Sequence, residues 1–205
     1  MTKPRKSVKR LLWDYTEAIV TALILALLIR AYVVQAFKIP SGSMKPTLLV
    51  GDHILVGKFI YGTRLPFMQE RILVLREPQR GDVIVFRYPK DPSRDFVKRI
   101  IAVGGDVVQG KDGVVYLNGR ALQEPYVNKD PTAAPAPLDD GDFGPILVPQ
   151  GKVFVMGDNR GQSYDSRYWG FVDIDDIKGK AFIIYWSWDR QRHLPRFNRI
   201  GKLVH

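Results

Sequence analysis

The stretch Ile39-Pro40-Ser41-Gly42-Ser43-Met44-Lys45-Pro46-Thr47-Leu48 separates the long apolar run of the chain from everything that resembles a folded domain. Two of its serines flank a single glycine, and a proline stands on either side of them. Proline fixes its own φ and pushes the preceding residue toward extended geometry, whereas glycine lets the backbone approach a ligand closely. The stretch therefore predicts a fixed, exposed loop that presents hydroxyl groups. The alternative interpretation is a polar linker between an apolar segment and a domain.

The apolar run lies immediately upstream of this loop. Residues 18–37 carry one charge, Arg30, and as a helix they would extend about 30 Å, which is enough to span a bilayer. Five basic residues and no acid stand in residues 1–10, and a basic flank of this kind stays in the cytoplasm. We therefore predict a single transmembrane anchor, with the N-terminus in the cytoplasm and the remaining chain across the membrane.

Two other interpretations of this run stay open. One is a cleavable signal peptide, because Val34-Gln35-Ala36 resembles the small-residue pattern that precedes a cleavage site. The other is a soluble amphipathic helix.

Composition excludes several function classes. The net charge is +10, and it is concentrated in residues 1–10 and 187–205. A nucleic-acid-binding protein spreads basic residues over a folded face, so the distribution favours a membrane neighbour and predicts no nucleic-acid partner. The chain has no cysteine, and its three histidines are scattered, so we predict no metal site and no cofactor.

From Gly51 onward the pattern is that of β-strands, with short apolar or alternating runs bounded by Gly, Pro and Asp. Residues 90–95 and 128–145 are interpreted as loops, the second rich in Pro, Asp, Gly and Ala. The predicted strands cover residues 52–56, 59–62, 71–75, 82–88, 96–103, 114–117, 153–156 and 181–186.

Lys98 is the first candidate for chemistry within these strands. Residues two apart in a strand share a face, so Lys98 projects with Phe96 and Ile100, while Val97 and Arg99 project from the opposite face. Burial disfavours the charged form of a lysine and lowers its pKa. Such a lysine can accept a proton from a serine hydroxyl. The alternative is an edge-strand lysine whose ammonium lies in solvent.

The segment from Gly157 to Gly170 is the second candidate, because it places small, polar and charged residues densely after a strand. Its acids and arginines can form ion pairs that hold a loop, and Ser163 can take part in a hydrogen bond there. A glycine-rich structural turn is the alternative. No G-x-S-x-G or S-x-x-K motif occurs in the chain, so a lysine is the most economical base for a nucleophilic serine.

Taken together, these stretches resemble the type I signal peptidases, a family of membrane-bound serine proteases that use a Ser-Lys dyad. The resemblance rests on residues 39–48, on Gly51-Asp52 through Tyr61-Gly62, on Arg80-Gly81-Asp82-Val83 through Lys98-Arg99, and on Gly157 through Gly170. These segments stand in the family's order over about 130 residues.

The resemblance implies a role for each matching residue. It implies Ser43 as nucleophile and Lys98 as general base, with the Ser41 side chain and the Ser43 backbone N–H stabilising the oxyanion. It implies that Ser163 orients the Lys98 amine. The remaining implied residues are Asp165 and Arg167, which would support that wall of the site, and Ile39 and Val97, which would line shallow pockets for small substrate side chains.

The resemblance also implies a fold and a biological setting. The fold is mostly β, an antiparallel catalytic core with a small β insertion, preceded by one transmembrane helix. The function is removal of N-terminal signal peptides from preproteins after small residues at −3 and −1, at the outer side of the bacterial inner membrane, with membrane lipid and the protein-export machinery as partners. The expected divisions are a tail (1–12), an anchor (13–37), a first core part (38–106), an insertion (107–150) and a second core part (151–205).

Two alternative functions remain at this point. A self-cleaving repressor-type protein uses the same dyad but carries a DNA-binding domain where this chain has its apolar run. A tethered, non-catalytic module that binds extended peptides at a sheet edge would keep the strands without needing both Ser43 and Lys98.

Overall fold

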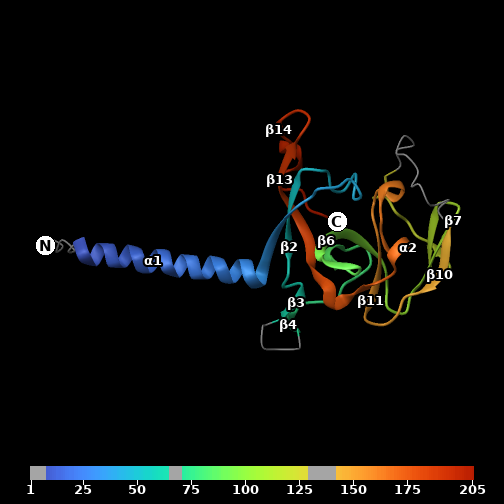
Figure 1. Ribbon diagram of the computed structural model, residues 1–205, viewed down its shortest axis with the longest axis horizontal. Coiled ribbons are helices and arrows are strands. Elements are labelled where there is room, and N and C mark those ends of the chain that lie inside the picture. Colours follow the sequence, from blue (N-terminus) through green and yellow to red (C-terminus); the bar gives the residue numbers. More distant parts are fainter. Residues whose placement is uncertain (1–7, 65–70, 129–141) are drawn as a thin grey trace.

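The computed structural model describes residues 8–64, 71–128 and 142–205. Figure 1 shows a long helix, α1, that projects away from a domain built of β-strands. The helical elements are α1 (Val8–Leu28), a π-helical turn (Ile29–Val33), α2 (Ser166–Trp169) and three short 3-10 turns (Arg160–Gln162, Ile174–Asp176, Phe197–Arg199). The strands are β1 (Val34–Lys38), β2 (Asp52–Gly57), β3 (Tyr61–Arg64), β4 (Arg71–Val74), β5 (Val83–Tyr88), β6 (Asp91–Val103), β7 (Val107–Lys111), β8 (Val114–Leu117), β9 (Arg120–Ala121), β10 (Phe143–Leu147), β11 (Lys152–Met156), β12 (Val172–Asp173), β13 (Ile177–Asp189) and β14 (Leu194–Pro195).

The main sheet runs in the order β1-β2-β13-β5-β6-β11-β12, with β14 paired to β13. A second sheet, β10-β7-β8-β9, lies within residues 107–150, and β3 and β4 form a two-stranded ribbon. The strand pairs of the described chain are antiparallel, which confirms the predicted mostly β, antiparallel core.

The core explains why the Ser43 loop is fixed. Ile39, Met44 and Leu48 are at most 3% exposed and belong to one apolar cluster with side chains of β2, β5 and β13. Burying three such side chains stabilises the loop by several kcal/mol, at about 1.5–3 kcal/mol each. The loop is therefore less exposed than predicted, because its apolar positions point inward while Ser41 stays exposed.

Most strands lie where the sequence places them, but β6 corrects one prediction. Residues 90–95 were expected to be a loop, whereas β6 begins at Asp91. The β5–β6 ladder extends to the pair Tyr88↔Asp91, so pairing across the hairpin keeps the segment extended in spite of Pro92. The Asn118-Gly119 turn is confirmed: both residues have positive φ, as a tight hairpin requires, and β8 pairs with β9 across them.

The boundary predicted for the anchor at residue 37 is wrong. Helix α1 ends at Leu28, and Val34–Lys38 is strand β1, whose ladder with β2 runs from Val34↔Gly57 to Lys38↔His53. Pairing with β2 draws this apolar segment into the sheet, so Val34-Gln35-Ala36 is part of a ladder. In the part of the chain that the structure describes, no helix combines the length and apolar character needed to cross a membrane.

Two predictions fall outside the described residues. They concern residues 1–7 of the basic tail and residues 129–141 of the expected loop. The remainder of that expected loop includes the start of β10 at Phe143.

Candidate active site

Ser43 and Lys98 meet although 55 residues separate them in the chain. The Lys98 ammonium donates a hydrogen bond to Ser43 Oγ at 2.7 Å. Ser43 comes from the loop after β1, and Lys98 comes from β6, opposite Ile84 of β5. Both residues are buried, at 9% and 5% exposure. The structure thus excludes the alternative in which the Lys98 ammonium lies in solvent.

Burial lowers the pKa of Lys98 to about 8 from its ordinary value of 10.5. Loss of hydration is the largest cause, and the Arg167 charge lowers the pKa further, whereas Asp165 and Asp158 oppose the shift. A substantial fraction of this amine is therefore neutral near physiological pH, and a neutral amine can take the proton of a serine hydroxyl.

The dyad lies in the wall of an open groove with a volume of about 480 Å³. The groove brings together five of the predicted site residues: Ile39, Ser41, Ser43, Val97 and Lys98. The other described residues that line it are Phe37, Lys38, Pro40, Met44, Val85, Arg94, Asp95, Phe96, Gln162 and Tyr164.

Residues from the Gly157–Gly170 segment hold the Ser43 loop, residues 39–48, which carries the candidate nucleophile and is called the nucleophile loop below. The Asn159 backbone N–H donates to the Ser43 carbonyl at 3.0 Å, and its side-chain amide donates to the Gly42 carbonyl at 3.1 Å. Gly157 must be glycine, because a Cβ there would lie 2.4 Å from the Ser43 carbonyl oxygen and 2.3 Å from Ser163 Oγ. The orientation of the Ser43 peptide is therefore fixed by long-range contacts.

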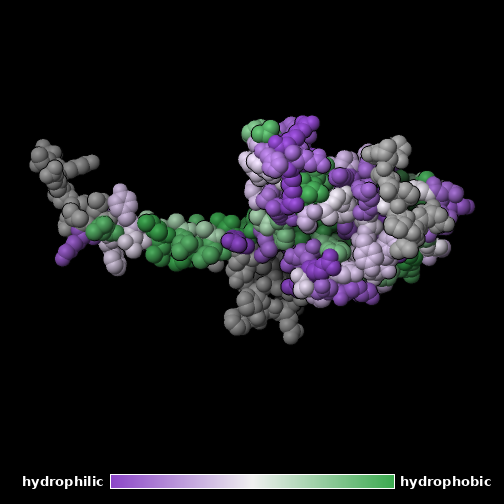
Figure 2. Space-filling view, turned by 45° about the horizontal axis from the view of Figure 1, so that its top comes forward, coloured by the Kyte–Doolittle hydropathy of each residue, from purple (hydrophilic) through white to green (hydrophobic). Residues whose placement is uncertain are grey.

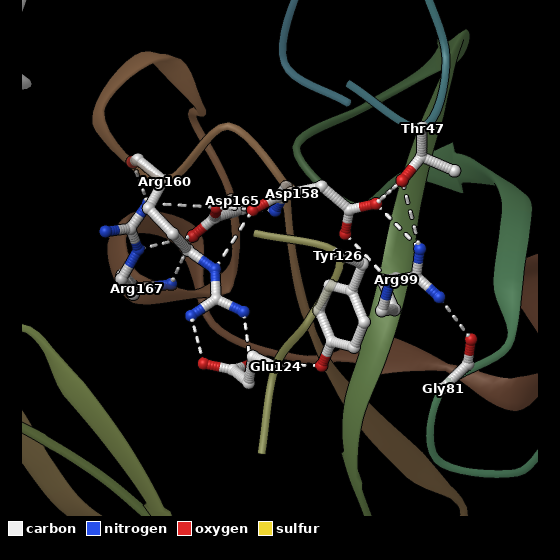
Figure 3. A network of polar contacts seen from close by, with 10 residues as sticks. Thr47, Gly81, Arg99, Glu124, Tyr126, Asp158, Arg160, Asp165 and Arg167 are labelled. Carbon is white, nitrogen blue, oxygen red and sulfur yellow. Dashed lines mark hydrogen bonds and ion pairs between the residues drawn. The ribbon is translucent and has the colours of Figure 1, made fainter. Parts of the chain in front are cut away.

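A buried ion pair lies on the opposite face of β6 (Figure 3). Arg99 is 1% exposed and donates two hydrogen bonds to Asp158, at 2.8 and 2.7 Å. The Tyr126 ring stacks on its guanidinium, 3.9 Å from carbon Cζ to the ring centroid, and Thr47 donates a hydrogen bond to Asp158. Since Thr47 belongs to the nucleophile loop and Asp158 to the second candidate segment, Arg99 joins the two.

Asp165 and Arg167 form the ion pair that the sequence predicts. The Arg167 Nε donates to Asp165 at 2.9 Å, and Asp165 also accepts the Gly157 N–H at 3.0 Å. The other two charged side chains of this segment have partners outside it: Asp158 pairs with Arg99, and Arg160 pairs with Glu124.

The prediction that Ser163 orients the Lys98 amine needs a correction. Its hydroxyl is buried and makes no hydrogen bond to the described residues, so the expected contact with the Lys98 amine is not formed. The Lys98 amine is directed at Ser43 instead, and Ser163 packs against Gly157 at the back of the nucleophile loop.

A second ionic cluster supports the far end of the same loop. Asp52 is fully buried and accepts hydrogen bonds from the Leu49 N–H, the Ser187 hydroxyl and the Arg199 guanidinium, at 2.8, 2.6 and 2.7 Å. Arg199 also donates to the Thr47 carbonyl at 2.8 Å. Part of the basic C-terminal segment is therefore used inside the domain.

Sequence reasoning missed Asn159, Tyr126, Glu124 and the pair Asp52–Arg199 as parts of the site. Each acts through a partner that is remote in the chain, and no local spacing signals such a contact. For Asn159, the only available signal was its place in the dense polar segment after a strand.

A buried amine bonded to a serine hydroxyl at the wall of an open groove is the arrangement of a serine hydrolase that uses lysine as its base. A protein-family model for signal peptidase, peptidase S26, matches residues 12–186. The chain is 40% identical to signal peptidase I of Pseudomonas fluorescens, over 93% of this chain and 79% of that protein. It is 35% identical to signal peptidase I of Bacillus licheniformis, over 94% of this chain and 98% of that protein. A crystal structure of a signal peptidase I from Enterococcus faecalis is 34% identical with a TM-score of 0.42, covering 51% of this chain and 97% of that chain.

The chain belongs to the signal peptidase family, peptidase S26. It is accordingly a hydrolase that removes signal peptides.

Proposed function

We propose that Ser43 is the nucleophile and Lys98 the general base of this peptidase. The neutral Lys98 amine takes the Ser43 proton as the hydroxyl oxygen attacks the scissile carbonyl, and it returns that proton to the leaving amine. The Lys98 amine then takes a proton from the water that attacks the acyl-enzyme ester and gives it to Ser43 Oγ as the ester C–O bond breaks, which releases the signal peptide and regenerates Ser43. The hydrogen bond of 2.7 Å between the two side chains is the observation that carries this proposal.

The oxyanion of each tetrahedral intermediate is stabilised by the Ser43 N–H and the Ser41 hydroxyl. The support is that Ser41 lines the groove with the dyad, and that Asn159 donates hydrogen bonds to the carbonyls of Gly42 and Ser43. Donors fixed in this way need no reorganisation during reaction, and one such donor contributes about 3–4 kcal/mol. Asp165 and Arg167, with Ser163 packed beside them, support the adjoining wall.

The substrate binds as an extended strand along β6. The support is that the β11 ladder reaches only to Arg99, so that no described strand pairs with residues 94–98 on that edge. Ile39 and Val97 line the groove there and leave room for small side chains at −3 and −1. Cleavage therefore follows a small-x-small sequence.

The test of the dyad is cleavage of a preprotein by the detergent-purified chain beside Ser43→Ala and Lys98→Ala. Each variant is expected to lose about 10³–10⁴-fold or more in kcat/KM, because a nucleophile and its base act as one unit. Mass spectrometry of the product reads the cut site, and circular dichroism confirms that the variants are folded. Unchanged cleavage in either variant would remove that residue from the mechanism. Binding of signal peptide with no cleavage by the wild-type chain would favour the non-catalytic module.

We further propose that the apolar segment made of α1 and the π-helical turn Ile29–Val33 together, rather than α1 by itself, anchors the chain in the bacterial inner membrane as a single pass, with its N-terminus in the cytoplasm and the catalytic domain outside. In this arrangement residues 34–106 and 151–205 form the catalytic core, because β1 belongs to its sheet, and residues 107–150 are the insertion. The support is the basic flank of residues 1–10 and the exposed apolar side chains along α1, visible as the projecting arm in Figure 2. The helix carries such side chains at Ile19, Leu23, Ile24 and Leu27.

Cysteine labelling tests this topology directly, because the chain has no native cysteine. In intact spheroplasts, an impermeant maleimide is expected to label Lys111→Cys, and to label Ser7→Cys only after permeabilisation. The reverse pattern would overturn the orientation, and equal labelling of both sites would overturn the single pass.

Membrane lipid and the export machinery are the proposed partners, and the hairpin of β13 and β14 is the proposed lipid contact. It exposes Trp186, Trp188 and Leu194 beside Arg190 and Arg192, and aromatic and basic side chains are those that favour an anionic membrane surface. In a chain beginning at residue 34, each of Arg190→Glu and Arg192→Glu is expected to weaken binding to anionic vesicles by about 1 kcal/mol. Lys111→Glu is the matched control, and equal binding by all variants would contradict the contact.

A further inference from the structure

The groove extends beyond the dyad to the end of β1 and the first half of β6, and the residues there form its second end. Lys38 of β1 lines one wall, and Arg94 of β6 lines the other. Lys178 links the walls at this end, since its ammonium donates to Asp95 at 2.7 Å and lies 6.0 Å from the centroid of the Phe37 ring.

This end of the groove is cationic. Among the described residues that line the groove, Asp95 is the one acid, and it is ion-paired with Lys178. Lys38 and Arg94 are exposed, and within the described chain neither has a carboxylate at ion-pair distance. Lys38, Arg94, Asp95 and Lys178 together carry a net charge of +2, and the nearby Asp91, whose pKa Arg94 helps to lower, does not line the groove.

Arg94 lies on the same face of β6 as Lys98 of the dyad. Arg94, Phe96 and Lys98 alternate on one face of β6, and the Phe96 ring is close to both cations. The Arg94 guanidinium lies 5.4 Å from the ring centroid, and the Lys98 ammonium lies 5.5 Å from it. A ring face at this distance attracts a cation and limits its orientations.

The free edge of β6 sets the distance between the two ends. Arg94 precedes Lys98 by four residues, or about 13 Å of strand. Val97, which in the proposed function faces a small residue before the cut, lies between Arg94 and Lys98 on β6 and therefore on the Arg94 side of the dyad. Substrate residues before the cut therefore run toward Arg94, and with −1 beside Lys98 the residue about five positions before the cut is beside Arg94.

We propose that Arg94 and Lys38 form a subsite that recognises a carboxylate side chain at position −5 of the signal peptide and discriminates against a basic one. This subsite rests on the proposed function, because it uses the substrate direction given above. Arg94 is the main determinant, since it lies on the strand that the substrate follows, and Lys38 adds a second cation from the opposite wall.

The expected selectivity is moderate because both cations are exposed. An exposed ion pair changes an equilibrium by about two- to five-fold, and a like-charge contact acts in the opposite direction by a similar factor. Glu at −5 is therefore expected to exceed Lys at −5 by about ten-fold in kcat/KM.

The test is internal competition between two otherwise identical preproteins, one with Glu and one with Lys at −5, cleaved together by the full-length chain. The ratio of the two products gives the ratio of kcat/KM and does not depend on how much of the enzyme is folded. Wild type is expected to give about ten, Lys38→Ala and Arg94→Ala about three each, and Arg94→Glu one or less. Arg87→Glu changes an exposed arginine that does not line the groove and is expected to keep the wild-type ratio.

The outcomes separate this subsite from the proposed function. If both substrates are cut at the same rate by wild type, or if Arg94→Glu keeps the wild-type ratio, the subsite is overturned while the peptidase stands. If neither substrate is cut, the proposed function itself fails. If Arg94→Glu changes only the activity in anionic vesicles and not the Glu-to-Lys ratio, the cations face lipid headgroups and the subsite is again overturned. A ratio that returns to one when the Glu–Lys pair is moved to −2 supports the assigned position.

Discussion

Lys98 and Arg99 are neighbours on β6 and are both buried, yet the partners of their charged groups differ. Arg99 is bound by the Asp158 carboxylate, by two carbonyl groups and by the Tyr126 ring. Among the residues that the structure describes, the Lys98 amine has a hydrogen bond only to the Ser43 hydroxyl, and burial lowers its pKa to about 8.

Both residues are buried, so the difference shows that the presence of a carboxylate partner decides whether a buried cation keeps its charge. A guanidinium stays protonated, and with a carboxylate partner it can act as a structural tie between segments. An amine without a carboxylate partner loses part of its charge and becomes a base. Because successive residues of a strand face opposite sides, one strand carries both functions without mixing them.

The largest expected effect comes from breaking the ion pair between Arg99 and Asp158. Arg99→Ala leaves Asp158 buried without its ion-pair partner, and we expect the free energy of unfolding to fall by about 3–5 kcal/mol. The double variant Arg99→Met with Asp158→Leu removes both charges and is expected to regain most of that loss. Urea unfolding of the three chains measures this, and a loss below about 1 kcal/mol in Arg99→Ala would show that the tie is weak.

Titration of the Lys98 amine is expected to make the rate of cleavage depend on pH. The base must be neutral to act, so kcat/KM rises with pH, about ten-fold per unit below the pKa of about 8 and levelling above it. Activity at pH 6 is therefore expected to be about 100-fold below its plateau. The profile is measured with one preprotein while circular dichroism follows the fold; a flat profile from pH 6 to 10 would exclude Lys98 as the base.

The smallest expected effect is a shift of the Lys98 pKa when a charge near the amine is removed. Asp165 raises the pKa of Lys98 and Arg167 lowers it. Asp165→Asn should therefore move the acid limb of the rate profile to lower pH, and Arg167→Gln should move it to higher pH, each by less than about one pH unit. If the acid limbs of the two variants moved in the same direction, the cause would be a structural effect of losing the Asp165–Arg167 ion pair.

Much of the fold followed from local patterns. Alternating and apolar runs identified most strands of the core, and the Asn118-Gly119 turn identified the hairpin between β8 and β9. Strand β1 and the start of β6 escaped, because an apolar run of helical length and a proline-containing segment became strands only through their pairing with β2 and β5.

The candidate site divides in the same way. An unusual loop and the strand alternation at Lys98 singled out two stretches, the family resemblance implied the pair Ser43 and Lys98 within them, and the structure brings these two side chains to 2.7 Å. The contact expected between Ser163 and Lys98 did not form, because a hydroxyl that is close in the fold can still point elsewhere, and side-chain direction depends on the neighbours.

The sequence alone provided the candidate residues, through unusual stretches and a family resemblance, and the face of each strand that they occupy, because side-chain direction in a strand follows a period of two. Only the tertiary structure decided which remote residues meet: Ser43 with Lys98, Asn159 with the nucleophile loop, Arg99 with Asp158, and Arg94 with the far end of the groove. The reason is that local periodicity fixes the direction of a side chain, whereas its partner depends on strand order and register, which are set by packing of the whole core.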